Sequence, residues 1–188
     1  MRIVALLLPL LLAAVGAFAQ ERPAKGDWDL GAYVSGGTSV EGGRRDTQVF
    51  SARARIGKVL TGEHGRGFLR GEFEYGVDFV PIYLVFQQTT VYGGGFDPLI
   101  LKWNFASKRR EVPYFELGGG TLFSTHEVPP GTSAVNFRTH ASLGLQVLSG
   151  PTVEIRYEHI SNAGLSVPNP GINTIQFVFG LSHFKSAK

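Results

Sequence analysis

The sequence contains no cysteine, and it has a single methionine among 188 residues. The lack of cysteine excludes disulfides, zinc–thiolate sites and a cysteine nucleophile. The chain also lacks a large net charge, because its 18 Lys and Arg residues nearly balance its 15 Asp and Glu residues. The basic residues are scattered along the sequence and do not form blocks. Nucleic-acid binding therefore has little support. Beyond the N-terminal segment no apolar run approaches the roughly 20 residues of a transmembrane helix, so a membrane-spanning form requires a closed β-barrel.

The N-terminal segment has the three parts of a secretory signal peptide. Arg2 precedes an apolar run over residues 3–15, and Ala17-Phe18-Ala19 supplies the small-residue cleavage pattern before Gln20. The apolar run is too short to span a bilayer. We therefore expect export with residues 1–19 removed, and one domain formed by residues 20–188.

Period-2 alternation of apolar and polar residues predicts the secondary structure. It gives eight segments separated by Gly, Pro, Asp, Asn or charged clusters, and no stretch has a convincing helical period. The fold class expected is all-β with eight antiparallel strands. The predicted strands are 28–36, 47–60, 67–80, 91–105, 113–125, 135–148, 152–161 and 174–184.

The two faces of these strands differ in composition. One face is apolar in every strand, whereas the other carries a nearly balanced set of charges. In a soluble β-sandwich the charged face would be solvated, and alternation alone permits that fold. An even strand number, an export signal and charges able to pair across a narrow lumen favour an eight-stranded transmembrane outer-membrane barrel. The residues predicted to face the lumen are Arg53, Arg55, Arg70, Glu72, Glu74, Asp78, Lys102, Glu116, Arg138, His140, Glu154, Arg156 and Glu158.

Two polar residues interrupt the apolar row of the seventh strand. His159 and Ser161 follow Val153, Ile155 and Tyr157 on the face that would meet lipid. A spacing of two places their Cβ atoms roughly 6.5 to 7 Å apart, within reach if the chain bends. His159 could then act as the general base for a Ser161 nucleophile attacking an ester. Spacing alone favours the simpler interpretation, in which both are interfacial polar residues at the end of the strand.

The residues that follow carry a family resemblance. The run YEHISNAGL over 157–165 and the run PNPGIN over 168–173 resemble the signature of PagL-type lipid A deacylases, the acyloxyacyl hydrolase-related family. Weaker similarity covers residues 91–96, 101–105 and 113–118. The resemblance implies an eight-stranded outer-membrane barrel that removes an ester-linked hydroxyacyl chain from lipid A by serine–histidine–acid catalysis, without a metal or other cofactor. It also implies an active site on the outside of the barrel wall.

The resemblance assigns roles to particular residues. Ser161 becomes the nucleophile and His159 the base, while Asn162 and the backbone around Ala163 and Gly164 become oxyanion donors. Asn173 stands where the family places a glutamate. Its side chain would share the outward face with Ile175 and contact His159 across the strand pairing.

An amide at position 173 can orient the imidazole but cannot compensate an imidazolium charge. Replacing Asn173 with Glu is therefore expected to raise activity. The alternative is that Asn173 is a turn or capping residue after Pro170-Gly171. Glu158 is nearer His159 in sequence, but alternation points it into the lumen.

These observations predict an outer-membrane ester hydrolase that acts on lipid A or a related glycolipid, reached laterally from the bilayer. One alternative is a structural or lipid-binding barrel of the same fold that lacks catalysis, as the missing glutamate would permit. Another is a soluble lipid-binding barrel. No metal or nucleic-acid partner is expected, and the formation of a homodimer is left open.

Overall fold

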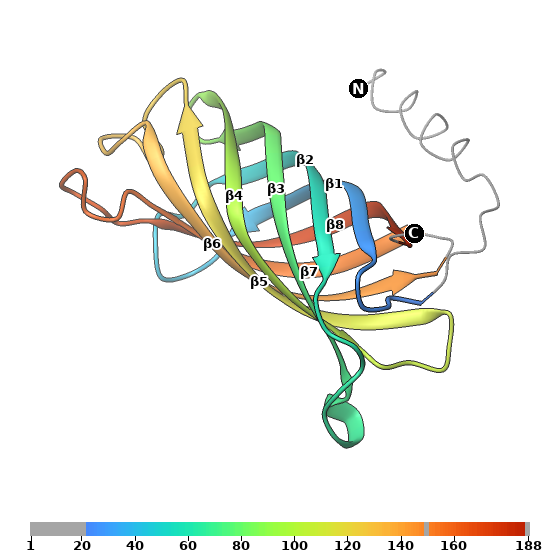
Figure 1. Cartoon of the computed structure of the whole chain (residues 1–188). Helices are drawn as coiled ribbons and strands as arrows, with labels where there is room; N and C mark the ends of the chain where they lie inside the picture. The colour runs from blue at the N-terminus through green and yellow to red at the C-terminus, as the bar shows by residue number, and fades with distance from the viewer. Residues whose placement is uncertain (1–21, 149–150, 187–188) are drawn as a thin grey trace, which may run out of the picture.

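The computed structural model describes residues 22–148 and 151–186, and it contains eight antiparallel strands closed into a barrel (Figure 1). The signal peptide assigned to residues 1–19 lies outside the described residues. Within them, no helix is long and apolar enough to cross a bilayer. The strands are β1 (Trp28–Ser39), β2 (Gln48–Val59), β3 (Gly71–Phe86), β4 (Thr90–Phe105), β5 (Glu111–Ser124), β6 (Val135–Val147), β7 (Pro151–Ser161) and β8 (Ile172–Lys185).

Each strand pairs with its neighbours in sequence, and β8 pairs with β1 to close the barrel. Closure leaves no open sheet edge. The expected fold class is confirmed, and seven predicted strands coincide with observed ones within a few residues. The predicted strand 67–80 differs most, because residues 67–69 form a short 3-10 turn and β3 continues through Pro81 to Phe86.

The wall separates two environments. Large apolar side chains such as Phe79, Leu143 and Phe177 are exposed on the outside, while charged side chains are buried inside. This distribution is the one that a barrel spanning a membrane requires, because its outer surface must be apolar. The predicted assignment of the two faces is therefore correct for most of the wall.

The interior is filled by paired charges. Arg55 donates from Nε and Nη2 to the two carboxylate oxygens of Asp78 at 2.7 and 2.8 Å, and it also bonds Glu116. Arg156 bridges Glu116 at 3.1 Å and Glu154 at 2.7 Å. These groups lie in contact across the barrel, so the lumen is packed with side chains, as expected for a small barrel.

Three charged residues differ from the predicted set of lumen residues. Arg70 is exposed and pairs with Glu63 at 2.7 Å, because β3 begins only at Gly71. Asp29 and Asp97, which were not predicted to face the lumen, are buried and bind Lys102 and Arg138 at 2.9 and 2.6 Å. Asp97 lies beside a register shift between Phe96 and Leu99, which reverses the alternation expected from the residues after it.

Beyond the charge network, toward the end of the barrel away from the C-terminus, the interior becomes apolar. Ile160 of β7 faces Ile172 of β8, and both are fully buried. They belong to a cluster whose members come from strands around the barrel and one loop: Val49, Val80, Tyr83, Val85, Val91, Leu122, Val128, Ile160 and Ile172. This cluster supports the end of β7 from the inside.

The lumen network predicts unequal costs for removing charged residues. Glu116→Ala should destabilise the barrel by about 3–5 kcal/mol, because Arg55 and Arg156 would keep buried charges without their shared partner. Arg70→Ala should cost only about 0–1 kcal/mol, because its pair with Glu63 is half exposed. Urea titration of the barrel refolded in lipid vesicles would measure both, and equal effects would contradict the buried network.

Candidate functional site

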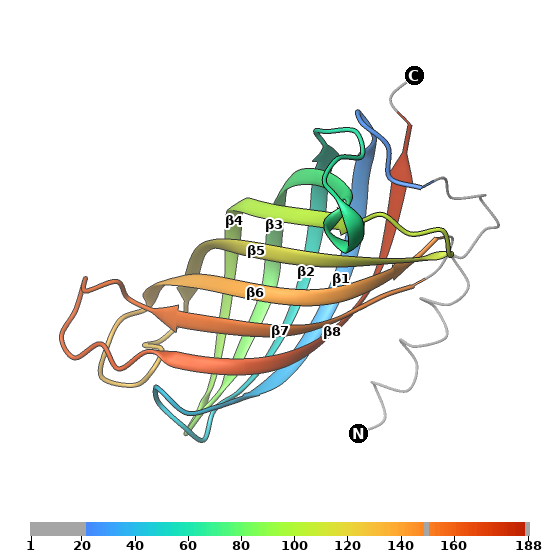
Figure 2. The same ribbon diagram turned by 90° about the horizontal axis from the view of Figure 1, so that it is seen from below.

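The candidate site lies where β7 ends and β8 begins, at the end of the barrel opposite the C-terminus. Figure 2 shows these two strands running side by side to the loop over residues 162–171 that joins them. Their register places His159 opposite Asn173, next to the buried pair of Ile160 and Ile172. The packing of Ile160 against Ile172 inside the barrel therefore fixes the positions of His159 and Asn173 on the outside.

His159 and Asn173 form a hydrogen bond. The Nδ1 atom of His159 lies 2.6 Å from Oδ1 of Asn173, in the contact that the strand pairing predicts. Asn173 is only 6% exposed, and His159 is half-buried. This short bond fixes the orientation of the imidazole ring. The second ring nitrogen, Nε2, remains available to bond another group.

Ser161 shares the outward row with His159 and is half-buried opposite Phe137 of β6. Among the described residues, no hydrogen bond joins its hydroxyl to His159. Two residues on one strand face keep their Cβ atoms about 7 Å apart, so side-chain rotation has to close the remaining gap. Such bonds are commonly long in a free enzyme and shorten when substrate binds.

Two glycines with positive φ leave room for the histidine and the amide. At Gly171, with φ +65°, a Cβ would lie 2.8 Å from Cε1 of His159. At Gly42, in the loop between β1 and β2, with φ +94°, a Cβ would lie 2.8 Å from Nδ2 of Asn173. That Nδ2 donates to the backbone carbonyl of Glu41 at 3.2 Å. The β1–β2 loop therefore touches the site, which nothing in the sequence pattern indicated.

The expected oxyanion donors are mostly engaged elsewhere. Asn162 points inward and is 1% exposed; its backbone N–H donates to Asn169 and its Nδ2 to the carbonyl of Ser166. The Gly164 N–H donates to Oδ1 of Asn162 at 2.9 Å. The Ala163 N–H has no hydrogen bond among the described residues, and Ala163 has a φ of +51°. Of the donors predicted from sequence, Ala163 is the one left to bind a developing negative charge.

The nearest carboxylate in sequence does not take part in the site. Glu158 is buried in the lumen, as alternation predicted, where it accepts hydrogen bonds from Tyr83 and Gln176. In the described ranges, no group of three or more His, Asp or Glu residues is arranged to hold a metal ion. The polar side chains that lie in the outward rows at this end of β7 and β8 are those of a serine, a histidine and an amide.

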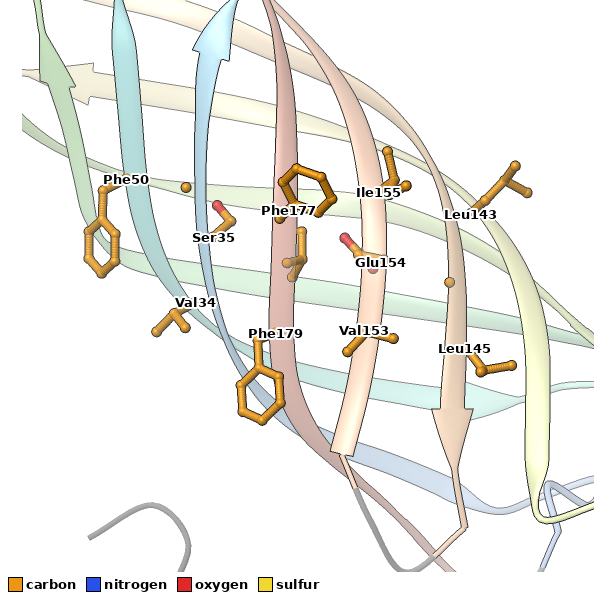
Figure 3. Close-up of a pocket in the computed structure, with 13 residues that line it drawn as sticks. Val34, Ser35, Phe50, Leu143, Leu145, Val153, Glu154, Ile155, Phe177 and Phe179 are labelled. Atoms are coloured by element: carbon orange, nitrogen blue, oxygen red, sulfur yellow. The ribbon is translucent and has the colours of Figure 1, made fainter. Parts of the chain in front are cut away.

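An apolar groove with a volume of about 790 Å³ lies on the outer wall (Figure 3). It is formed by parts of β7, β8 and neighbouring strands that lie between the site and the end of the barrel that holds the C-terminus. The outward row of β7 leads into it from His159 through Tyr157 to Ile155. Gly36 of β1 contributes no side chain, and a Cβ there would have its nearest neighbour at 3.9 Å, so the groove has free space at this point. Its outward-facing side chains are those of Val34, Phe50, Leu143, Leu145, Val153, Ile155, Phe177 and Phe179.

Known proteins resemble this chain in fold and in sequence. The crystal structure of the outer membrane enzyme PagL superimposes with a TM-score of 0.61 and 20% identity, covering 81% of this chain and 98% of that one. Lipid A deacylase PagL of Bordetella bronchiseptica is 36% identical over 69 residues, which span 35% of this chain and 39% of the relative. The family model for lipid A 3-O-deacylase (PagL) matches residues 33–182. This match extends from β1 into β8, and the chain belongs to the lipid A 3-O-deacylase (PagL) family.

Proposed function

We propose that the protein is an outer-membrane hydrolase that removes an ester-linked hydroxyacyl chain from lipid A or a related glycolipid. The observation that carries this proposal is the hydrogen-bonded pair of His159 and Asn173, with Ser161 in the same outward row, on the apolar wall of a barrel of this family. Membership of the family supports ester hydrolysis in general. The roles of individual residues below are part of the proposal.

The residues supply a complete route for acyl transfer. Nε2 of His159 takes the proton from Ser161 Oγ as that oxygen attacks the ester carbonyl carbon. The N–H of Ala163 donates to the oxyanion of the tetrahedral intermediate, an interaction typically worth about 3 kcal/mol. His159 then returns the proton to the departing sugar oxygen. Water, deprotonated by His159, attacks the acyl group on Ser161. His159 passes that proton to the departing Ser161 Oγ, which releases the hydroxy fatty acid and restores the serine and the histidine.

The position of the site suits a substrate that stays in the membrane. The polar end of the wall would lie at the headgroup level, and the acyl chains would run down the outward rows into the groove beside Ile155 and Phe177. The ester would thereby reach Ser161 laterally, without leaving the bilayer. The location in the outer membrane is supported by the description of the solved relative as an outer membrane enzyme.

The first test is replacement of the nucleophile. Ser161→Ala should abolish deacylation, lowering kcat by at least about a thousandfold, because the histidine then has no hydroxyl to activate. Mass spectrometry of lipid A from cells producing each protein would show loss of one hydroxyacyl chain only with the unmodified protein. The control is Thr121→Val, which removes a hydroxyl of β5 that donates to the backbone carbonyl of Phe96 at 3.3 Å and should leave activity intact.

The alternative of a non-catalytic barrel makes a different prediction for this experiment. Lipid A of unchanged mass with both the unmodified protein and Ser161→Ala, with both folded in the membrane, would contradict hydrolysis of that substrate. Equal deacylation by both would instead exclude Ser161 as the nucleophile.

The groove can be tested separately from the chemistry. Gly36→Leu places a side chain in free space of the groove, and it should lower kcat/KM several-fold for long acyl chains but not for short ones, since pocket discrimination is worth about 1–3 kcal/mol per methylene. Deacylation of synthetic glycolipids of graded chain length would measure this. Ala54→Leu places the same side chain on the outer wall outside the groove, adding one carbon fewer than Gly36→Leu, and serves as the control. Equal effects of the two variants on all chain lengths would argue against chain binding in the groove.

A further inference from the structure

We propose that the β1–β2 loop is part of the active site: the backbone carbonyl of Glu41 fixes the amide of Asn173, and the amide fixes the proton on His159. Glu41 and the neighbouring Gly42 are thus positioning residues. This inference rests on the proposed function, because it assigns His159 the task of a base. It concerns a loop that the family signature in residues 157–173 does not include.

The direction of the hydrogen bonds follows from what each group can do. A carbonyl oxygen only accepts, so the Asn173 atom 3.2 Å from the Glu41 carbonyl is the amide NH₂. The other amide atom, Oδ1, is then an acceptor facing His159 Nδ1 at 2.6 Å. Nδ1 must therefore carry a proton, which in the neutral imidazole leaves Nε2 with its lone pair. Nε2 is the atom that has to accept a proton from Ser161.

The loop is held firmly enough to play this part. The N–H of Val40 donates to the carbonyl of Asn173, and the N–H of Arg44 donates to that of Gly171, both at 2.8 Å. These bonds extend the pairing of β1 and β8 past the end of β1. The Glu41 side chain is 86% exposed and pairs with Arg45, so the group that Glu41 offers to the site is its carbonyl and not its carboxylate.

These contacts suit an amide better than a carboxylate. A carboxylate at position 173 would still accept from His159, but its second oxygen would face the Glu41 carbonyl, and two acceptors repel each other. The additional methylene of glutamate would also have to fit beside Gly42, where space is short. The expectation that Asn173→Glu raises activity is therefore reversed, and we expect both Asn173→Asp and Asn173→Glu to lower kcat.

The decisive variant is Gly42→Ala. Its Cβ would lie 2.8 Å from Asn173 Nδ2 and displace the amide from the carbonyl. The matched control is Gly131→Ala, which has the same kind of backbone strain, with φ +82°, but no atom within 4 Å of the added Cβ. In ¹⁵N-histidine spectra of the full barrel in detergent micelles, assigned with His159→Gln, unmodified protein and Gly131→Ala should show the Nδ1–H tautomer of His159. Gly42→Ala should show a mixture of tautomers.

Activity should change in parallel. Gly42→Ala should lower kcat about tenfold or more with little change in KM, since a wrong tautomer disables the base, and Gly131→Ala should remain within about twofold of the unmodified protein. Unchanged tautomer and kcat in Gly42→Ala would overturn the inference, as would an Asn173→Glu protein more active than the original. The tautomer measurement needs no substrate, so it decides the role of the loop even if Ser161→Ala shows that the proposed reaction is wrong.

Discussion

The alternation of side chains along the paired strands of a closed barrel is the constraint on which the rest of this structure depends. Along a paired strand, successive side chains point alternately to the lumen and to the outside, because the backbone is pleated and its polar groups bond the neighbouring strands. A site on the outside therefore receives only every second residue of a strand, here His159, Ser161 and Asn173. In the proposed mechanism, the oxyanion donor and the group that orients Asn173 come from the backbone of loops, at Ala163 and Glu41.

The other half of the alternation makes the site rigid. The residues between the outward ones, Glu158 and Ile160, are buried in the charge network and in the apolar cluster. Moving β7 outward would break both a set of lumen hydrogen bonds and a packed apolar contact with Ile172. Charged residues that lie close to His159 in sequence are thus part of the support for the site and not of its chemistry.

The sequence was informative where the alternation is unbroken. β7 has no bulge, so the outward positions of His159 and Ser161 and the inward position of Glu158 could be predicted by counting residues. β3 and β4 contain register shifts, which bury Tyr83 and Asp97 against that count. The contact between His159 and Asn173 was predictable because adjacent strands set it. The contact with Glu41 was not, because every residue has a carbonyl and only the folded loop brings this one to the site.

In the proposed mechanism, the amide at position 173 does only part of what a carboxylate would do. A carboxylate both orients a histidine and offsets the charge that the histidine gains in the transition state, whereas an amide only orients it. In the proposed reaction, solvent would then stabilise the developing imidazolium of His159, and the half-buried position of this residue at the rim of the barrel allows water to reach it. A neutral amide also spares this apolar wall the cost of desolvating a carboxylate. An amide can replace the carboxylate only while it keeps one orientation, and for that reason we propose that the carbonyl of Glu41 matters to a reaction that it does not touch.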